Sequence, residues 1–419
     1  MASLIRRLHL LPASATADAR VLVLTRASRG FADGLVAVLL ASYLKEIGFS
    51  NFEIGVLITG TLLGSAFLTL ASGFLAARVS RRRVLLLASG LMFLTGLGFA
   101  SFTDFWPLLL VAVLGTVNPS AADVSVFLPT EQALLPDTVN DRDRTALFAR
   151  HNLAGRLMGA FGALASGLPV IVAEARDWDL ADTQRLGFLV YAAVAVGVTV
   201  MYTRLSPNLE KREPGKADAP LKKSRRTVFR LAALFSLDSA AGGLVVDSIL
   251  ALWLFNRFDF STETVAAIFF GAGLLLAFSQ LVSPWLAARV GLINTMVFTH
   301  LPANFLLILA ALMPVGELAV ACLLLRMLFA QMDVPARQSY VTSVVPREER
   351  AAAASVTNVP RSLAQAGTPV IAGLLLSQTD FGWPLIIAGL GKATYDILLL
   401  IQFRALKPPE EGGAAVDAD

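Results

Sequence analysis

The chain has 419 residues, of which 56% are hydrophobic and 16% are charged, and its mean hydropathy is +0.67. Soluble proteins carry about 25% charged residues, so this composition excludes an ordinary soluble domain and indicates a membrane protein. The formal net charge is +4, but the basic residues lie between apolar runs, which indicates membrane topology rather than nucleic-acid binding. The single cysteine, Cys322, excludes an intrachain disulfide.

The chain begins with a short segment that contains Arg6, Arg7 and an apolar core ending at Pro12. This core is too short for a secretory signal, so we interpret residues 1–19 as a cytoplasmic leader. The apolar runs that follow are each long enough for a helix of about 20 residues to cross a bilayer, and the sequence lacks the short alternating strands of an outer-membrane barrel. Twelve spans are predicted, at 20–45, 52–77, 84–103, 107–135, 145–173, 185–204, 229–256, 262–288, 291–314, 318–344, 351–378 and 383–404.

A repeat links the two sets of six spans. Phe49-Ser50 opens an apolar run that ends at Leu75-Ala-Ala-Arg78. Phe260-Ser261 opens another that ends at Leu286-Ala-Ala-Arg289, 211 residues later. The identical spacing indicates that the second set arose by duplication of the first.

A companion repeat supports this interpretation, because Pro129-Thr-Glu-Gln132 matches Pro335-Ala-Arg-Gln338, 206 residues later. We therefore predict an all-α membrane protein with twelve transmembrane helices in two pseudo-symmetric six-helix bundles. The predicted parts are the leader, an N-terminal bundle (20–205), a polar cytoplasmic linker (206–228), a C-terminal bundle (229–405) and a cytoplasmic tail (406–419).

The distribution of Lys and Arg predicts the orientation. The loops of one side and the linker are rich in basic residues, whereas the loops of the other side carry only Lys45, Arg176, Arg185 and Arg257. Positively charged loops stay in the cytoplasm. We therefore predict a multi-pass protein of the inner (cytoplasmic) membrane with both termini in the cytoplasm.

Several ionisable residues are predicted at membrane depth, where each costs about 2.5–3.5 kcal/mol on insertion scales and normally faces protein or water. At a rise of about 1.5 Å per residue, seven of them fall near mid-bilayer. Together with Arg29, which lies nearer the cytoplasmic side, they are the predicted substrate- or proton-binding residues. This set is Arg29, Asp33, Asp123, Arg156, Asp238, Arg326, Asp333 and Arg361.

The segment Gly73-Phe-Leu-Ala-Ala-Arg78-Val-Ser-Arg-Arg82 resembles the signature of the major facilitator superfamily, and Leu286-Ala-Ala-Arg289 echoes it. The resemblance implies that spans 1, 4, 7 and 10 line a central cavity, that spans 3, 6, 9 and 12 lie outside, and that the two halves rock around a midplane site. The family pattern has an Asp where this chain has Ala77 and Ala288. The cytoplasmic lock that this Asp would form is therefore expected to be weaker or to use other groups.

Helical spacing suggests three local pairs. Arg29 precedes Asp33 by four residues, which predicts either a self-neutralised pair or a binding carboxylate tuned by its neighbour. Lys392 and Asp396 have the same spacing and are predicted to neutralise each other. Arg337 is predicted to pair with Asp333 in the same way. His151 and His300 are predicted to have ordinary interfacial positions.

The companion repeat places opposite charges at matching positions, because Glu131 corresponds to Arg337. A gate salt bridge between the two is the alternative to the local pair of Arg337, and Arg78 and Arg289 are further gating candidates. Gln132, Asn152, Gln338 and Asn358 are predicted to be polar residues of the cavity.

The midplane arginines have two interpretations. Arg156 and Arg361 suit bidentate binding of an anionic substrate, but they equally suit neutralisation of the neighbouring acids. Near-balance between acidic and basic residues at this depth favours internal pairing.

No phosphate-binding Gly-x-x-x-x-Gly-Lys-Ser/Thr loop is present, so energy would come from ion or solute gradients. We predict a monomeric secondary transporter that exports a small organic solute in exchange for protons. Uptake or exchange of an organic anion, and a non-transporting receptor or assembly protein, are the alternatives. The sequence shows no nucleophile–base pair and no metal-ligand cluster, which predicts no enzyme activity, cofactor or metal. It leaves the identity of the solute open.

Overall fold

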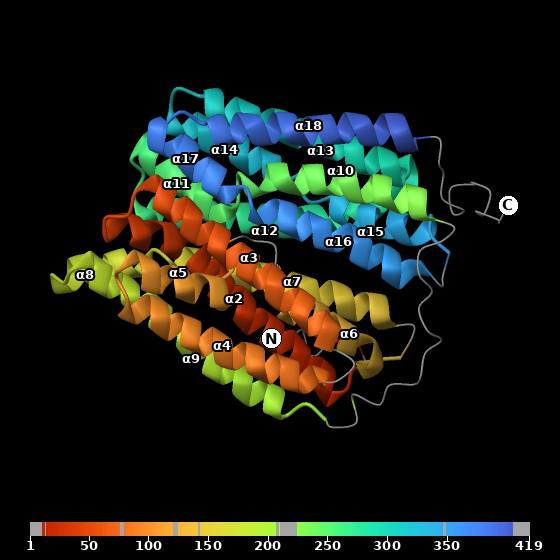
Figure 1. Cartoon of the computed structure of the whole chain (residues 1–419), viewed down its shortest axis with the longest axis horizontal. Helices are drawn as coiled ribbons and strands as arrows, with labels where there is room; N and C mark the ends of the chain where they lie inside the picture. The colour runs from red at the N-terminus through yellow and green to blue at the C-terminus, as the bar shows by residue number, and fades with distance from the viewer. Residues whose placement is uncertain are drawn as a thin grey trace, which may run out of the picture. The chain divides into compact units, whose positions relative to one another are not determined.

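The computed structural model describes residues 11–12, 14–75, 79–119, 125–140, 143–206, 209, 224–346 and 349–404, and its regular elements are all helices (Figure 1). Most of the leader, most of the linker and the tail lie outside these residues, as do Arg78 and Asp123. The predicted all-helical architecture is confirmed.

Each of the first six predicted spans coincides with one, two or three helical elements in succession. They are α2 (Ala17–Glu46), α3 (Asn51–Leu75), α4 (Arg81–Ser101), α5 (Phe105–Leu114) followed by α6 (Phe127–Leu134) and the 3-10 helix η1 (Leu135–Thr138), α7 (Arg144–Ala165) followed by α8 (Leu168–Arg176), and α9 (Leu180–Thr203).

The last six spans follow the same plan. They are α10 (Arg225–Gly243) followed by α11 (Asp247–Phe258), α12 (Thr262–Val290), α13 (Leu292–Leu312), α14 (Gly316–Met327) followed by α15 (Asp333–Ser343), α16 (Arg350–Ala366) followed by α17 (Pro369–Gln378), and α18 (Trp383–Phe403). By length and composition alone, nine stretches of the described chain are long and apolar enough to cross a membrane.

Prolines mark two of the breaks inside spans. Pro169 lies in the first turn of α8 and Pro369 opens α17. Proline lacks the amide hydrogen that a helix interior needs, but it is tolerated in the first turn of a new helix. The fifth and eleventh spans, which match each other in the repeat, therefore each contain a break with a proline at the start of the second helix.

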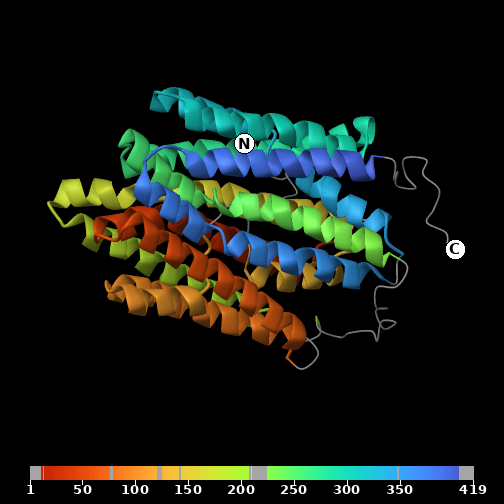
Figure 2. The same cartoon turned by 45° about the horizontal axis from the view of Figure 1, so that its top comes forward.

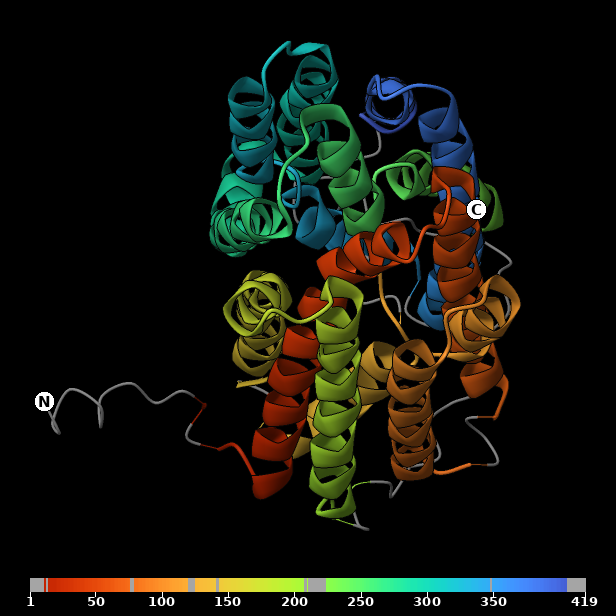
Figure 3. The same cartoon turned by 90° about the vertical axis from the view of Figure 1, so that its left-hand side faces the viewer.

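The chain folds into two compact units, which are residues 1–48, 60–213 and 262–270, and residues 49–59, 214–261 and 271–419. In the first unit α9 packs beside both α2 and α4, as Figure 3 shows for the yellow-green, red and orange helices. Close α2–α7 packing depends on glycines, because a Cβ added to Gly34 would collide with the carbonyl oxygen of Gly159.

In the second unit α10 packs along α16 and α18, and α13 packs along α14, α15 and α18. Figure 2 shows α10, in green, beside α16, in blue. An apolar cluster joins α10, α13, α15 and α18 and contains Phe235, Met296, Tyr340 and Tyr395. The same four helices carry the polar network described next, which begins one turn beyond this cluster.

Candidate functional site

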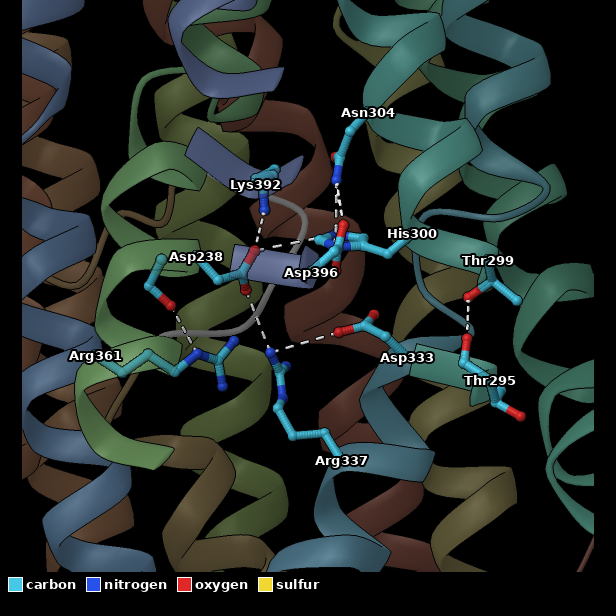
Figure 4. A network of polar contacts seen from close by, with 11 residues as sticks. Asp238, Thr295, Thr299, His300, Asn304, Asp333, Arg337, Arg361, Lys392 and Asp396 are labelled. Carbon is cyan, nitrogen blue, oxygen red and sulfur yellow. Dashed lines mark hydrogen bonds and ion pairs between the residues drawn. The ribbon is translucent and has the colours of Figure 1, made fainter. Parts of the chain in front are cut away.

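Asp238 on α10 is the centre of a buried polar network in the second unit (Figure 4). Lys392 on α18 donates from Nζ to Asp238 Oδ1 over 2.7 Å. Arg337 on α15 donates from Nη1 to Asp238 Oδ2 over 3.3 Å. Only 5% of Asp238 is exposed, so these cations supply the compensation that a buried carboxylate requires.

Arg337 also contacts a second acidic side chain. Its Nη1 lies 3.5 Å from Oδ2 of Asp333, four residues earlier on the same helix. The local pair expected from the sequence is therefore present, and Arg337 is shared between two carboxylates. Because both distances exceed those of a tight ion pair, a small movement would favour one acid over the other.

His300 on α13 lies between Asp238 and another buried acid, Asp396 on α18. Its Nδ1 is 3.0 Å from Asp396 Oδ1, and its Nε2 is 4.0 Å from Asp238 Oδ1. The side-chain nitrogen of Asn304, one turn further along α13, donates to Asp396 Oδ2 over 2.8 Å. The two ring nitrogens of His300 thus face two different carboxylates.

Two further contacts lie at the edges of the network. Arg361 on α16 donates from Nε to Ser239 Oγ over 2.8 Å, beside Asp238 on α10. The ring of Tyr395 packs edge-on against both His300 and Phe235. One side of the network is therefore polar and charged, while the other is closed by the apolar cluster.

Glu131 on α6 is the centre of a separate network in the first unit. Tyr202 on α9 and Thr25 on α2 donate to its Oε1 over 2.6 and 3.0 Å. Arg29 Nη2 and His151 Nε2 lie 2.6 and 3.2 Å from its Oε2. Glu131 is 0% exposed, and one carboxylate thus receives four partners from three neighbouring helices.

The two networks join corresponding helices with inverted polarity. In the first unit a base on the first span, Arg29, meets an acid on the fourth, Glu131. In the second unit an acid on the seventh span, Asp238, meets a base on the tenth, Arg337. The predicted asymmetry between Glu131 and Arg337 thus has a structural counterpart, in which each residue is bound within its own unit.

The predicted site residues divide into those that enter the two networks and those that do not. Asp238, Asp333, Arg337 and Arg361 lie at or beside the Asp238 network, and Arg29 and Glu131 form the core of the other. Half-buried positions elsewhere on the spanning helices are those of Asp33, Gln132, Asn152, Arg156 and Arg326.

The other predicted residues lie at the surface or outside the description. Asn358 is exposed on α16. Arg289 is exposed near the end of α12, with its guanidinium 4.1 Å from the ring centre of Trp285. Arg78, Asp123 and the side chain of Gln338 lie outside the described residues.

Two sequence-based predictions were wrong. Lys392 and Asp396 were expected to neutralise each other, but Lys392 binds Asp238 and Asp396 binds His300 and Asn304. His300 was expected at an interface, yet it is 4% exposed inside the network, and His151 is likewise buried beside Glu131. The polar pair His300 and Asn304, one turn apart in a span without acidic or basic side chains other than His300, was the available signal.

Within the part of the chain that the structure describes, no group of three His, Cys, Asp or Glu side chains is placed to hold a metal ion. The networks instead consist of carboxylates, cationic side chains and imidazoles, which are in direct contact with one another on helices of the predicted spans. Such an arrangement is suited to moving protons and exchanging ion-pair partners.

Comparison with known proteins places this geometry in context. The family model described as Major Facilitator Superfamily matches residues 22–364. An uncharacterized membrane protein of Saccharomyces cerevisiae is 26% identical over 407 residues, which cover 88% of this chain and 90% of the yeast protein.

The fold is similar to those of solved transporters. A D-xylose-proton symporter has a TM-score of 0.74 at 13% identity, covering 94% of this chain and 99% of its own. A bacterial homolog of the human lysosomal transporter Spinster, inward-facing and occupied, has a TM-score of 0.71 at 16% identity, with coverages of 92% and 97%. The nucleoside transporter NupG has a TM-score of 0.69 at 14% identity, with coverages of 93% and 99%.

Proposed function

The chain belongs to the major facilitator superfamily, and from this premise we propose that it moves a small organic solute across the membrane by alternating access, coupled to proton movement. The family is one of transporters rather than enzymes. Export is the proposed direction, the inner membrane the proposed location, and a monomer the proposed working unit.

The shared position of Asp238 is the observation that carries proton coupling. Three side chains from three helices, Lys392, Arg337 and His300, face this one carboxylate. Protonation of Asp238 would remove the charge that holds two permanent cations. A buried charge without a partner costs several kcal/mol, so proton binding and the packing of these helices depend on each other.

The solute is proposed to contact polar side chains on the spanning helices outside the two networks. Asn358 supports this proposal, because an amide exposed on a membrane-spanning helix suits a water-filled passage better than lipid. The other proposed contacts are Asp33, Asp123, Gln132, Asn152, Arg156, Arg326 and Gln338.

The networks also bear on the proposed gate. Glu131 and Arg337 each hold helices of their own unit together, so we propose that they act through those contacts. Arg289, exposed at the end of its helix, and Arg78 are proposed to close the cytoplasmic side in place of the acid missing at Ala77 and Ala288.

Reconstituted protein tests the function. Purified protein is first screened by thermal shift against sugars, nucleosides, peptides and organic anions, because a bound ligand raises apparent stability. A solute that shifts the melting temperature is then added to liposomes that contain the reconstituted protein and a pH-sensitive dye. We expect a pH gradient to drive its accumulation, and solute entry to move protons.

Two variants sharpen this assay. Asp238→Asn is expected to abolish proton movement, whereas Asp182→Asn, at an exposed helix end beside Arg185, is expected to leave it unchanged. If transport does not depend on the pH gradient but requires an anion on the opposite side of the membrane, the protein exchanges anions and is not coupled to protons. A ligand that binds without moving would indicate the non-transporting alternative.

A further inference from the structure

The ninth and twelfth spans contain more buried polarity than their expected outer position explains. His300 and Asn304 on α13, and Lys392 and Asp396 on α18, are all buried, and Asp396 is 0% exposed. Polar residues inside a membrane protein are costly and generally serve function. Lys392 and His300 approach Asp238, which the proposed function uses, and Asp396 and Asn304 are joined to it through His300.

The imidazole of His300 is placed to receive and donate a proton at different atoms. Asp396 Oδ1 and His300 Nδ1 are 3.0 Å apart, a distance at which the two atoms can share a proton that either is able to hold. On the other side of the ring, Nε2 is 4.0 Å from Asp238 Oδ1. A movement of about 1 Å would bring this second pair to hydrogen-bond distance.

Lys392 has two acids within reach of its helix position. It now binds Asp238, but it also lies four residues before Asp396 on α18, a spacing that puts both on one helical face. A proton on Asp238 and a negative charge on Asp396 would reverse its preference. Arg337 has the same freedom, because Asp333 already lies beside it.

We propose that His300 passes one proton from Asp396 to Asp238 while Lys392 moves in the opposite direction, from Asp238 to Asp396. This step rests on the proposed function and identifies the groups that couple protons to transport. The exchange breaks the Lys392–Asp238 contact between α10 and α18. Lys392 and Asp396, both on α18, then pair with each other. Reversal of both movements restores the present arrangement.

The transfer is balanced. The O–H bond of Asp396 breaks as an N–H bond forms at His300 Nδ1, and the N–H bond at Nε2 breaks as an O–H bond forms at Asp238. One proton has moved and the total charge is unchanged. Because Lys392 then meets Asp396 and Arg337 keeps Asp333, neither of these cations is left buried without an acid.

Other charged groups face the relay from neighbouring helices. Asp333 and Arg337 approach from α15 and Arg361 from α16, while Arg326 on α14, which has no direct contact with the described residues of the network, acts on Asp238 only through its charge. The Tyr395 ring packs against His300 from α18. These residues are present in every variant below, so a change in behaviour is attributable to the replaced group.

Nuclear magnetic resonance of the full chain in lipid tests the relay with the proton itself as the probe. The chain has three histidines, so ring-¹⁵N labelling gives few signals, which His300→Gln and His151→Gln assign. As the pH is varied between about 5 and 9, we expect the Nδ1 and Nε2 signals of His300 to move in opposite directions, because the relay removes the proton from one nitrogen and places it on the other. Asp396→Asn should abolish this response while the His151 signals keep theirs.

A second label tests the movement of Lys392. In ¹⁵Nζ-lysine-labelled protein, the Lys392 signal is identified by its loss in Lys392→Gln. We expect it to shift with the same midpoint as the His300 ring. His300→Gln should abolish that shift, which provides a second test if Asp396→Asn does not fold.

The outcomes separate the two proposals. A His300 response that persists unchanged in Asp396→Asn would refute the relay, and a Lys392 signal that ignores the His300 titration would refute the exchange. If both responses occur but wild-type liposomes show no proton-driven transport, the relay stands and the proposed function fails. If transport is proton-driven but His300 does not respond, the function stands and the relay fails.

Discussion

The Glu131 and Asp238 networks solve the same problem in different ways. In the first, one carboxylate receives donors from Thr25, Arg29, His151 and Tyr202. In the second, three carboxylates, those of Asp238, Asp333 and Asp396, share four partners at distances between 2.7 and 4.0 Å. A carboxylate whose oxygens both have hydrogen-bond partners holds its helices together, whereas carboxylates that share partners allow those partners to be exchanged. This difference underlies our proposal that the first half anchors its helices and the second couples transport to protons.

Glu131→Gln is the most direct test of the anchoring role. The substitution keeps the shape but leaves Arg29, which is 1% exposed, without the acid that binds it. Breaking a buried ion pair by removing one partner costs about 3–5 kcal/mol. We expect the free energy of unfolding in a fixed detergent to fall by that amount.

Asp238→Asn is expected to have a smaller effect on stability. Lys392 and Arg337 lose a charged hydrogen-bond partner, worth about 1.5–3 kcal/mol, but Asp396 and Asp333 are near enough to replace it. Unfolding in the same detergent measures the difference. Equal losses for Glu131→Gln and Asp238→Asn would contradict the distinction between the networks.

Gly34→Ala tests whether the first unit depends on close helix packing. Its new Cβ would meet the Gly159 carbonyl oxygen, which is backbone and cannot rotate away. Overpacking of this kind costs about 1–3 kcal/mol. Gly197→Ala is the matched control, because nothing lies within 4 Å of the added carbon on α9. Similar melting temperatures for the two variants would refute the packing argument.

Tyr202→Phe should cause the smallest change. It removes one of the hydrogen bonds to Glu131, at 2.6 Å, and leaves Arg29 and His151 in place. The net value of such a bond is about 0.5–1.5 kcal/mol. A loss as large as that of Glu131→Gln would mean that Tyr202, rather than Arg29, is the main partner of the carboxylate.

The architecture could be predicted from the sequence because hydropathy and the 211-residue repeat are visible in the order of the residues alone. The partners of the charges were not. Lys392 and Asp396 have ideal spacing for a local pair, but Lys392 binds a carboxylate 154 residues away. Tertiary packing overrode the local preference. The family resemblance also implies that the ninth and twelfth spans lie outside the cavity, a position that does not predict the buried polar contacts of His300 and Asp396.

The Arg29–Glu131 pair, finally, constrains the order in which the protein can be built. Arg29 leaves the ribosome 102 residues before Glu131, so the first span enters the insertion machinery before its acid exists. Asp238 likewise precedes Arg337 by 99 residues and Lys392 by 154. Each of these contacts can therefore form only after the later span of its pair has been made. A chain divided in the linker would keep both sets of partners together, whereas one divided after the third span would separate Arg29 from Glu131.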